Sequence, residues 1–131
     1  ANAFIYSTFG RKRRLENVKS ADKGIASHEV RSGINFLVQS VASDINLLGA
    51  IDMNSYIKQH KLKSKIFALV HDSVLAEVPE HEIDHYCKKL KEFIQADRGV
   101  YIEGCPVGCD FDVAGDYSLG KFEKTYGELL Q

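Results

Sequence analysis

The sequence lacks a strong net charge, a long apolar run and internal repeats. Its 131 residues carry 17 Lys or Arg and 18 Asp or Glu, so the net charge of −1 indicates no general attraction to polyanions. No run of about 18 apolar residues is present, which argues against a membrane span. No repeat, low-complexity tract or linker interrupts the chain, and 44% hydrophobic residues are enough for a core. We therefore expect one unit over residues 1–131.

The sequence also has few cysteines, namely Cys87, Cys105 and Cys109. Their number is odd and no signal-peptide pattern precedes them, so a reduced, cytoplasmic compartment is the simpler expectation. Cys105 and Cys109 form a C-x-x-x-C pair, but no second pair and no histidine at ligand spacing accompany it. Buried or half-buried thiols are therefore favoured over a zinc site.

Basic residues are concentrated near the start of the chain. Residues 1–40 hold seven Lys or Arg against three acidic residues, whereas residues 41–131 hold ten against fifteen. Four of the basic residues are consecutive, Arg11–Arg14, and follow Gly10 in what we predict to be a basic turn. Such an asymmetry is typical of a segment that contacts a polyanion, although an ordinary solvated surface explains the charges alone at least as well.

Two stretches have the spacing of helices. Apolar residues recur every three or four positions from about Ser27 to residue 60, which predicts a long amphipathic helix with a possible bend at Gly49. A second helix is predicted from Glu80 to about Asp97, because acidic residues suit a first turn and apolar residues then recur at helical spacing. The apolar stripe of the long helix comprises Val30, Ile34, Leu37, Val38, Val41, Ile45 and Leu48.

The remaining segments favour strands and turns. Residues 1–9 are aromatic and extended in character, residues 65–79 form an apolar hairpin, and residues 106–113 alternate well enough for a final strand. Residues 115–117 are predicted to turn before a polar tail. The order strand, long helix, hairpin, helix, strand predicts an α+β fold.

The hairpin Lys65–Pro79 carries the most informative residues, because His71 and Asp72 fall at its turn. Aspartate is rarely placed in a strand for packing reasons, and a carboxylate at the tip of a buried hairpin is held rigidly. This arrangement suits a divalent metal ion and a phosphate, as in phosphoryl transfer. The alternative is a turn-forming aspartate, and His71 is either a phosphate or primer contact or a turn residue.

A metal phosphohydrolase is a weaker hypothesis for the same His-Asp pair. It requires further histidine ligands at helical spacing, and only His81 and His85 offer that spacing. Both fall in the second predicted helix, which we expect to cover the surface. This chemistry is therefore disfavoured.

A polar row accompanies the apolar stripe of the long helix. Arg31, Asn35 and Gln39 lie at i, i+4 and i+8, so they share one helical face with a drift of about 40° per step. An arginine and two amides are suited to phosphates and base edges, which makes the row a candidate nucleic-acid contact. The alternative is a solvated helix face.

These motifs together resemble DNA polymerase family A, the bacterial DNA polymerase I type. The string from Arg31 to Ile45 resembles the R-x-x-x-N-x-x-x-Q helix of that family, and Leu69–Ser73 resembles its palm motif C, usually Val-His-Asp-Glu. Thr8–Leu15 resembles the Gly-Arg-Arg segment before the helix, and Gly115–Tyr117 stands where the family has Gly-x-x-Trp. The resemblance covers residues 5–118, with the motifs in the family's order.

The resemblance implies a role for each motif. Asp72 would be one of two catalytic palm aspartates that hold Mg2+, and His71 would contact the primer-terminal region. Arg31, Asn35 and Gln39 would line the duplex near the growing end. A basic segment would lie along the DNA backbone and add salt-dependent affinity. This segment comprises Arg11, Lys12, Arg13 and Arg14.

The sequence departs from the family pattern in two ways. Ser73 replaces the usual glutamate after Asp72, so its role as a metal ligand is doubtful. The motif A segment with the other catalytic aspartate, and the fingers helix that binds the incoming nucleotide, are found nowhere in residues 1–131. One carboxylate at a hairpin tip cannot hold two metal ions by itself.

We therefore expect the carboxyl-terminal palm part of a family A polymerase, with an antiparallel palm-type sheet and catalytic-type hairpin packed against two helices. It would be a subunit of a split polymerase or a truncated piece, inactive alone. Its partners would be DNA primer-template, deoxynucleoside triphosphates and the remaining polypeptide with motif A, fingers and thumb. No membrane is involved, and a viral source would place the chain in the host cytoplasm.

Two further expectations concern the isolated chain. The aromatic start of the chain has little to pack against within residues 1–131, so we expect oligomers or partial disorder at that end. A non-catalytic nucleic-acid-binding or fold-completing subunit with a palm-like fold is the alternative function, and Ser73 favours it. The aromatic start comprises Phe4, Ile5, Tyr6 and Phe9.

Overall fold

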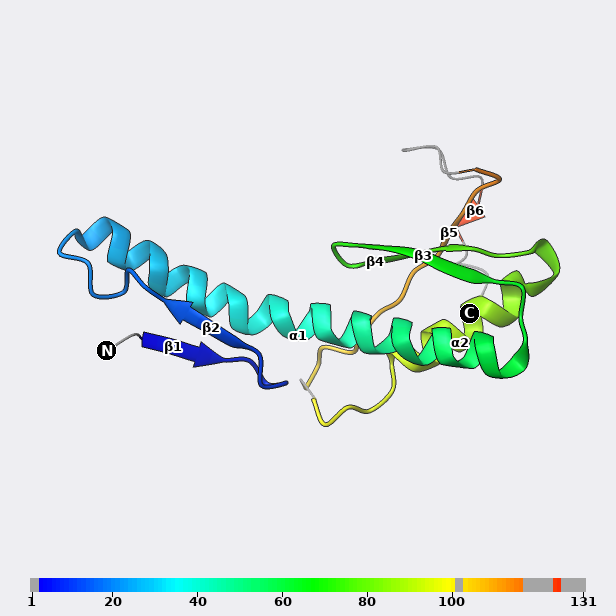
Figure 1. Cartoon of the computed structure of the whole chain (residues 1–131), viewed down its shortest axis with the longest axis horizontal. Helices are drawn as coiled ribbons and strands as arrows, with labels where there is room; N and C mark the ends of the chain where they lie inside the picture. Colours follow the sequence, from blue (N-terminus) through cyan, green and yellow to red (C-terminus); the bar gives the residue numbers. More distant parts are fainter. Residues whose placement is uncertain (1–2, 101–102, 117–123, 126–131) are drawn as a thin grey trace. The chain divides into compact units, whose positions relative to one another are not determined.

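The computed structural model describes residues 3–100, 103–116 and 124–125. The chain forms two compact units, residues 1–47 and residues 48–131, and helix α1 (Lys23–His60) contributes to both (Figure 1). The described strands pair in three separate two-stranded antiparallel ladders. The predicted α+β class is confirmed by this mixture of helices and antiparallel strands, and the expectation of a single unit stays a prediction.

The first unit begins with a hairpin of strands β1 (Ala3–Tyr6) and β2 (Lys12–Leu15). The chain reverses between them: the Ser7 amide donates to the Arg11 carbonyl at 2.9 Å, and Gly10 has a φ of 79°. The predicted basic turn at Arg11–Arg14 is therefore wrong. Because the glycine completes the reversal before Arg11, the basic residues continue into a strand.

Helix α1 starts earlier than its apolar stripe suggested. Asp22 caps its first turn, with Oδ1 accepting hydrogen bonds from the amides of Gly24 at 2.7 Å and Ile25 at 3.3 Å. The helix ends in a left-handed residue, Lys61, with a φ of 53°, and the Leu62 amide reaches back five residues to a carbonyl of the last turn. The capping aspartate thus starts the helix before the predicted Ser27, whereas its end at His60 agrees with the prediction.

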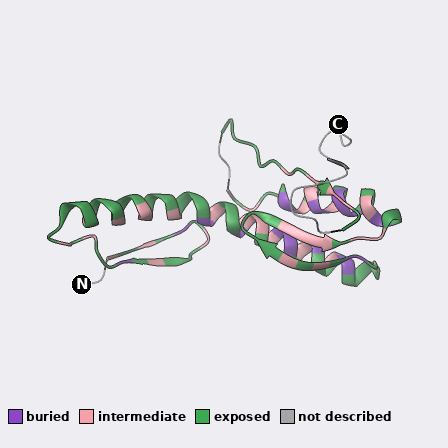
Figure 2. Cartoon of the chain, turned by 90° about the horizontal axis from the view of Figure 1, so that it is seen from above, coloured by how far each residue is buried: buried purple, intermediate pink, exposed green. Residues whose placement is uncertain are grey.

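The face of α1 that meets the first hairpin is small and polar rather than apolar. Gly33 is buried there, and a Cβ at this position would lie 3.3 Å from the Leu15 side chain and 3.4 Å from that of Ile5. The predicted apolar stripe exists, but it lies largely exposed: Ile34 is 58% exposed and Val38 69% (Figure 2). A residue without a side chain allows the hairpin to approach closely, so the hairpin packs on this face instead.

The second unit packs the later part of α1 against helix α2 (Ile83–Ile94), which follows the short helix η1 (Glu80–Glu82). Helix α1 continues through Gly49, and the suggested bend at this residue stays a prediction. Gly49 permits close approach: a Cβ there would lie 2.7 Å from the Ile94 side chain and 3.2 Å from the Ile94 Cα. The buried apolar side chains of this unit are Ala50, Met53, Ile57, Tyr86, Cys87, Leu90 and Ile94.

Helix α2 ends at Ile94, three residues before the predicted end at Asp97. The chain leaves the helix here because Arg98 is held elsewhere: its guanidinium donates to the Asp52 carboxylate on α1 at 2.7 Å and to the Phe93 carbonyl at 2.9 Å. This arginine ties the segment after α2 to α1 within the second unit.

The second unit contains the other two ladders. Strands β3 (Lys65–Val70) and β4 (Ser73–Glu77) form the predicted hairpin, and β5 (Asp112–Val113) pairs with β6 (Lys124–Thr125). The predicted strand over residues 106–113 is therefore wrong except for its last two residues, because only those have a ladder partner in the described chain. The predicted turn at 115–117 includes Tyr117, which lies outside the described residues.

Glu82 is a buried carboxylate that fixes the start of β3. Its two oxygens accept hydrogen bonds from the Lys63 and Ser64 amides, each at 3.0 Å, and from the Ser64 hydroxyl at 2.6 Å. The Ser64 hydroxyl and these amides stabilise the charged form and lower the pKa of the Glu82 carboxyl below its ordinary value. The ionised form of Glu82 therefore favours the folded state of the second unit.

We expect this glutamate to make stability depend on pH. A lowered folded-state pKa gives stability that is fully present above the ordinary glutamate pKa and is lost as the pH falls through the folded-state value. The urea midpoint, followed by circular dichroism, should fall more steeply on acidification in the native chain than in Glu82→Gln. Glu80→Gln, an exposed neighbour, is the control and should behave like the native chain. Equal acid sensitivity of both variants and the native chain would contradict the role of Glu82.

Candidate functional site

The tip of the β3–β4 hairpin is a two-residue turn made by His71 and Asp72. The ladder extends to the pair Val70 and Ser73, so the turn follows directly on paired strands. His71 has a φ of 53°, a left-handed conformation that tight hairpin turns require and that non-glycine residues rarely adopt. The backbone on both sides therefore fixes the position of Asp72.

The hairpin is more exposed than its apolar sequence suggested. His71, Asp72 and Ser73 are all exposed, and on β3 Phe67 is 60% exposed. The expectation of a buried hairpin is therefore wrong for this chain, because the second unit covers only part of the two strands. The Asp72 carboxylate is open to a ligand.

The donor atoms at the tip suit a hard cation such as Mg2+, which prefers oxygen ligands and keeps several waters. Asp72 supplies a carboxylate and Ser73 a hydroxyl. In the described part of the chain, however, no three His, Cys, Asp or Glu side chains gather closely enough to hold a metal ion. The chemistry of the donors fits Mg2+, but a complete site requires carboxylates from elsewhere.

The polar row on α1 is arranged as predicted. Arg31, Asn35 and Gln39 are exposed on one face of the helix in the first unit. None of the hydrogen bonds found among the described residues uses their side chains, so their donors and acceptors face solvent. The row lies in the first unit and Asp72 in the second, and their participation in one site stays a prediction.

The predicted basic segment, which comprises Arg11 and the first three residues of β2, is divided between two sides of the hairpin. Arg11 forms an ion pair with Asp44 on α1, whose hydrogen bond and charge raise the pKa of the Arg11 guanidinium. Arg13 donates to the Ser32 hydroxyl at 2.7 Å. Lys12 and Arg14 alternate with them and are exposed. Among these four residues, only Lys12 and Arg14 are left without a side-chain hydrogen bond or an acidic partner in the described part of the chain.

Asp44 is a residue that the sequence interpretation missed. It is buried on the face of α1 toward the hairpin and holds Arg11 there. Asp44 lies at helical spacing from Gly33 rather than from the apolar stripe. This spacing was the signal in the sequence that could have identified it. Because of this ion pair, Arg11 contributes to the fold in addition to any contact that it makes with a ligand.

The two histidines of the disfavoured metal hypothesis have other neighbours. His81 lies in η1 with its ring 3.7 Å from the Glu82 carboxylate, whereas the His85 ring shares a 3.0 Å hydrogen bond with the Tyr56 hydroxyl. Cys87 is buried, and burial raises the pKa of its thiol to about 11, so it is a neutral packing residue at ordinary pH.

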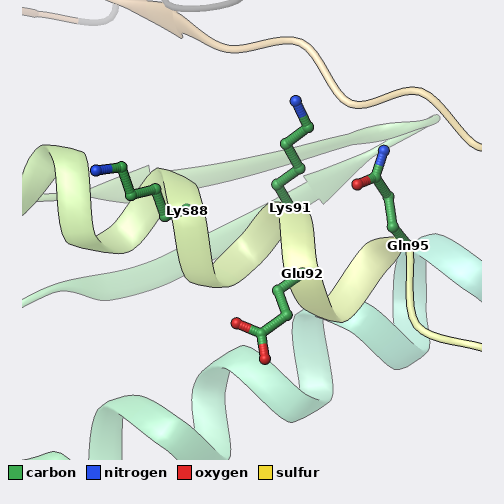
Figure 3. A pocket seen from close by; sticks show the side chains of 4 residues that line it. All are labelled: Lys88, Lys91, Glu92 and Gln95. Carbon is green, nitrogen blue, oxygen red and sulfur yellow. The ribbon is translucent and has the colours of Figure 1, made fainter. Parts of the chain in front are cut away.

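Among the described residues of the second unit two pockets stand out, and Asp72 lines neither of them. The first is an open depression of about 380 Å3 on α2, where Lys91 and Gln95 point to one side of the helix and Glu92 to the other (Figure 3). The second has a volume of about 340 Å3 and lies between β4, α2 and residues 111–116. The hairpin tip is thus an exposed projection rather than the floor of a cleft.

The sequence of the chain decides its family. Residues 1–118 match the family model described as DNA polymerase family A. The chain belongs to DNA polymerase family A. This confirms the resemblance inferred from the polar row and the hairpin motif.

Known relatives of this family A chain include phage and bacterial polymerases. The DNA polymerase of Escherichia phage T5 is 50% identical over 134 residues, which cover 98% of this chain and 16% of that protein. DNA polymerase I of Caldicellulosiruptor bescii is 36% identical over 63% of this chain and 10% of its own length. The chain therefore spans less than a fifth of these relatives.

A solved structure supports the same assignment. The POL domain of Pol1 from M. smegmatis, in complex with DNA primer-template and dNTP, is 28% identical with a TM-score of 0.65. The match covers 70% of this chain and 16% of that one.

Helix α1 is, by length and composition, apolar enough to cross a membrane, contrary to expectation, but such helices also occur in soluble cores. Membership of DNA polymerase family A is a better guide to the role of α1 than its apolar composition.

Proposed function

We propose that residues 1–131 are the carboxyl-terminal palm part of a DNA-directed DNA polymerase and contribute one metal-binding aspartate to nucleotidyl transfer. The observation that carries the proposal is the position of Asp72, exposed at the tip of a paired hairpin in a family A chain. A carboxylate fixed by two strands is preorganised for a ligand, which is what electrostatic catalysis requires.

The residues at the tip have distinct proposed roles. Asp72 holds Mg2+ with carboxylates from the remaining polypeptide, Ser73 adds a weaker oxygen donor, and His71 positions the primer-terminal nucleotide. Mg2+, when bound, neutralises charge on the phosphate oxygens. In the complete enzyme the primer 3′-hydroxyl attacks the α-phosphate of a deoxynucleoside triphosphate, and positioning supplies much of the acceleration.

The first unit is proposed to contact the DNA. Arg31, Asn35 and Gln39 present one arginine and two amides that no described side chain bonds, which suits the minor groove and template strand near the primer end. Lys12 and Arg14 add phosphate contacts, with a smaller share from Arg11 and Arg13, since those two are engaged with α1.

A partner polypeptide is proposed to cover the apolar surface of the chain. Ile34 and Val38 are exposed on α1 in the first unit, and Phe67 and Leu69 are exposed on β3 in the second. Exposed apolar side chains that gather on one surface mark interaction sites, so each unit offers its own candidate surface. The remaining polymerase, with motif A, fingers and thumb, is the proposed partner, and the chain alone is expected to be inactive. We place the complex in the cytoplasm, that of the host if the source is viral.

The second candidate function is a non-catalytic DNA-binding or fold-completing subunit. Ser73, in place of the usual glutamate, is the observation that favours it, because a hydroxyl is a poorer metal ligand than a carboxylate. In that case the hairpin tip would be dispensable once the partner is present.

Primer extension distinguishes the two candidates. The 50% identity with the phage T5 polymerase allows a chimera in which this chain replaces the matching segment of that enzyme. We expect extension with Mg2+ and four nucleotides from the chimera, and none from the 131-residue chain alone or from the T5 polymerase lacking the segment. A folded, DNA-binding chimera without extension would favour the non-catalytic subunit.

A further inference from the structure

The face of the first hairpin that points away from α1 combines aromatic and basic side chains. Phe4 pairs with Arg14 across the ladder, and Tyr6 pairs with Lys12. Successive residues of a strand point to opposite faces, so these four share one face. We call it the aromatic–basic face, and it consists of Phe4, Tyr6, Lys12 and Arg14.

The rings of this face are available for stacking. Phe4 is 47% exposed and Tyr6 55%, with ring centroids 5.4 Å apart and an angle of 73° between their planes. The Lys12 amine lies 4.0 Å from the Phe4 centroid and 5.9 Å from that of Tyr6. The Lys12 amine therefore lies over the Phe4 ring and near Tyr6, so a base that stacks on that side of Phe4 has to displace it and can bring its phosphate to the same cation.

The opposite face of the hairpin shows that packing does not explain the aromatic residues. Ile5 and Leu15 contact Gly33, and Arg13 bonds to Ser32 on α1. The inward positions thus build the fold of the first unit. The outward positions are left to solvent although they carry two large rings.

We propose that the aromatic–basic face binds single-stranded nucleic acid, with bases stacked on Phe4 and Tyr6 and phosphates held by Lys12 and Arg14. Exposed rings combined with a cationic backbone track are the usual means of binding single strands without sequence preference. The inference rests on the proposed function in one respect, namely that the nucleic acid bound is DNA. It adds a contact to unpaired nucleotides beside the duplex contact proposed for the polar row.

The charges favour a nucleic acid over a protein on this face. Interface cores between proteins are enriched in aromatic residues but depleted in lysine, because burying an unpaired cation is unfavourable. Here every ring has a cationic cross-strand neighbour, and none of the described acidic groups pairs with Lys12 or Arg14. An anionic ligand that stacks satisfies both features at once.

Binding of an oligothymidylate to the 131-residue chain tests the proposal. With a labelled strand of about 15 nucleotides and fluorescence anisotropy at low salt, Phe4→Ala with Tyr6→Ala should weaken binding about tenfold or more. Lys12→Ala with Arg14→Ala should reduce the slope of log affinity against log salt by about 1.4, since two phosphate contacts are lost. Phe67→Ala, which removes an equally exposed ring from β3, is the matched control and should bind normally.

The outcomes separate this inference from the proposed polymerase role. Unchanged oligothymidylate binding by the double aromatic variant, with circular dichroism showing an intact fold, would overturn the inference and leave the extension experiment unaffected. Loss of association with the remaining T5 polymerase, while oligothymidylate binding persists, would instead make the face a protein interface and also overturn it. If the chimera is inactive in primer extension but oligothymidylate binding still depends on Phe4 and Tyr6, the inference is supported. Only the proposed polymerase role would then be contradicted.

Discussion

Asp72→Asn in the T5 chimera is expected to lower the rate of nucleotide incorporation on the order of a thousandfold, because a metal-ligand charge contributes several kcal/mol to the transition state. The substitution keeps the shape of the side chain and removes its charge. Asp72 is exposed at a turn that the β3–β4 ladder fixes, so the fold should be unaffected. Single-turnover primer extension measures the loss directly.

The control for this prediction is another exposed aspartate of the same unit. Asp84 lies in the first turn of α2, away from the hairpin tip, and Asp84→Asn should incorporate nucleotides at the normal rate. Affinity for duplex primer-template should change little in either variant, since the contacts proposed along the duplex lie on α1 and β2 in the first unit. An Asp72→Asn chimera with undiminished single-turnover rate would refute the metal-ligand role and favour the fold-completing subunit.

Gly49→Ala is expected to destabilise the second unit by about 1–3 kcal/mol, as overpacking of a well-packed core does. The added methyl would meet the Ile94 side chain at 2.7 Å and the Ile94 Cα at 3.2 Å. The second contact is with backbone, so rotation of a side chain cannot relieve it. Urea denaturation followed by circular dichroism gives the change in the free energy of unfolding.

A second glycine of the same helix provides the matched control. The nearest atoms to the methyl group of Gly33→Ala would be side-chain methyl groups of Leu15 and Ile5, at 3.3–3.5 Å. Those groups can shift by a few tenths of an ångström, and alanine is favoured over glycine in a helix by about 1 kcal/mol. We expect Gly33→Ala to change stability by less than about 1 kcal/mol. If Gly49→Ala is as stable as Gly33→Ala, the prediction is contradicted. Helices α1 and α2 can then move apart without a loss in the free energy of unfolding.

Local signals in the sequence identified most elements of the fold. The hairpin turn at His71 and Asp72 follows from apolar alternation around a polar pair, and α1 and α2 follow from helical spacing. The boundaries were less well predicted. Asp22 begins α1 before its apolar stripe, and Arg98 draws the chain away from α2 through a partner 46 residues earlier in the sequence.

The division of the basic segment could not be obtained from the sequence. Four consecutive basic residues have the same composition whether they form a turn or a strand. The reversal at Gly10 makes them a strand, and strand alternation then sends Arg13 toward α1 and Lys12 and Arg14 to solvent. The aromatic–basic face exists only because of that alternation.

By itself the sequence determined the family, the α+β class and the identity of the candidate residues, because these depend on motifs whose residue types and spacing are local. The tertiary structure decided which face of α1 is buried and which basic residues are engaged. Periodicity shows that a helix has an apolar stripe but not what covers it, and here Gly33 let a hairpin pack beside the stripe instead. Close approach and long-range pairing depend on residues distant in the sequence, such as Arg11 with Asp44, and no local pattern encodes such a partner.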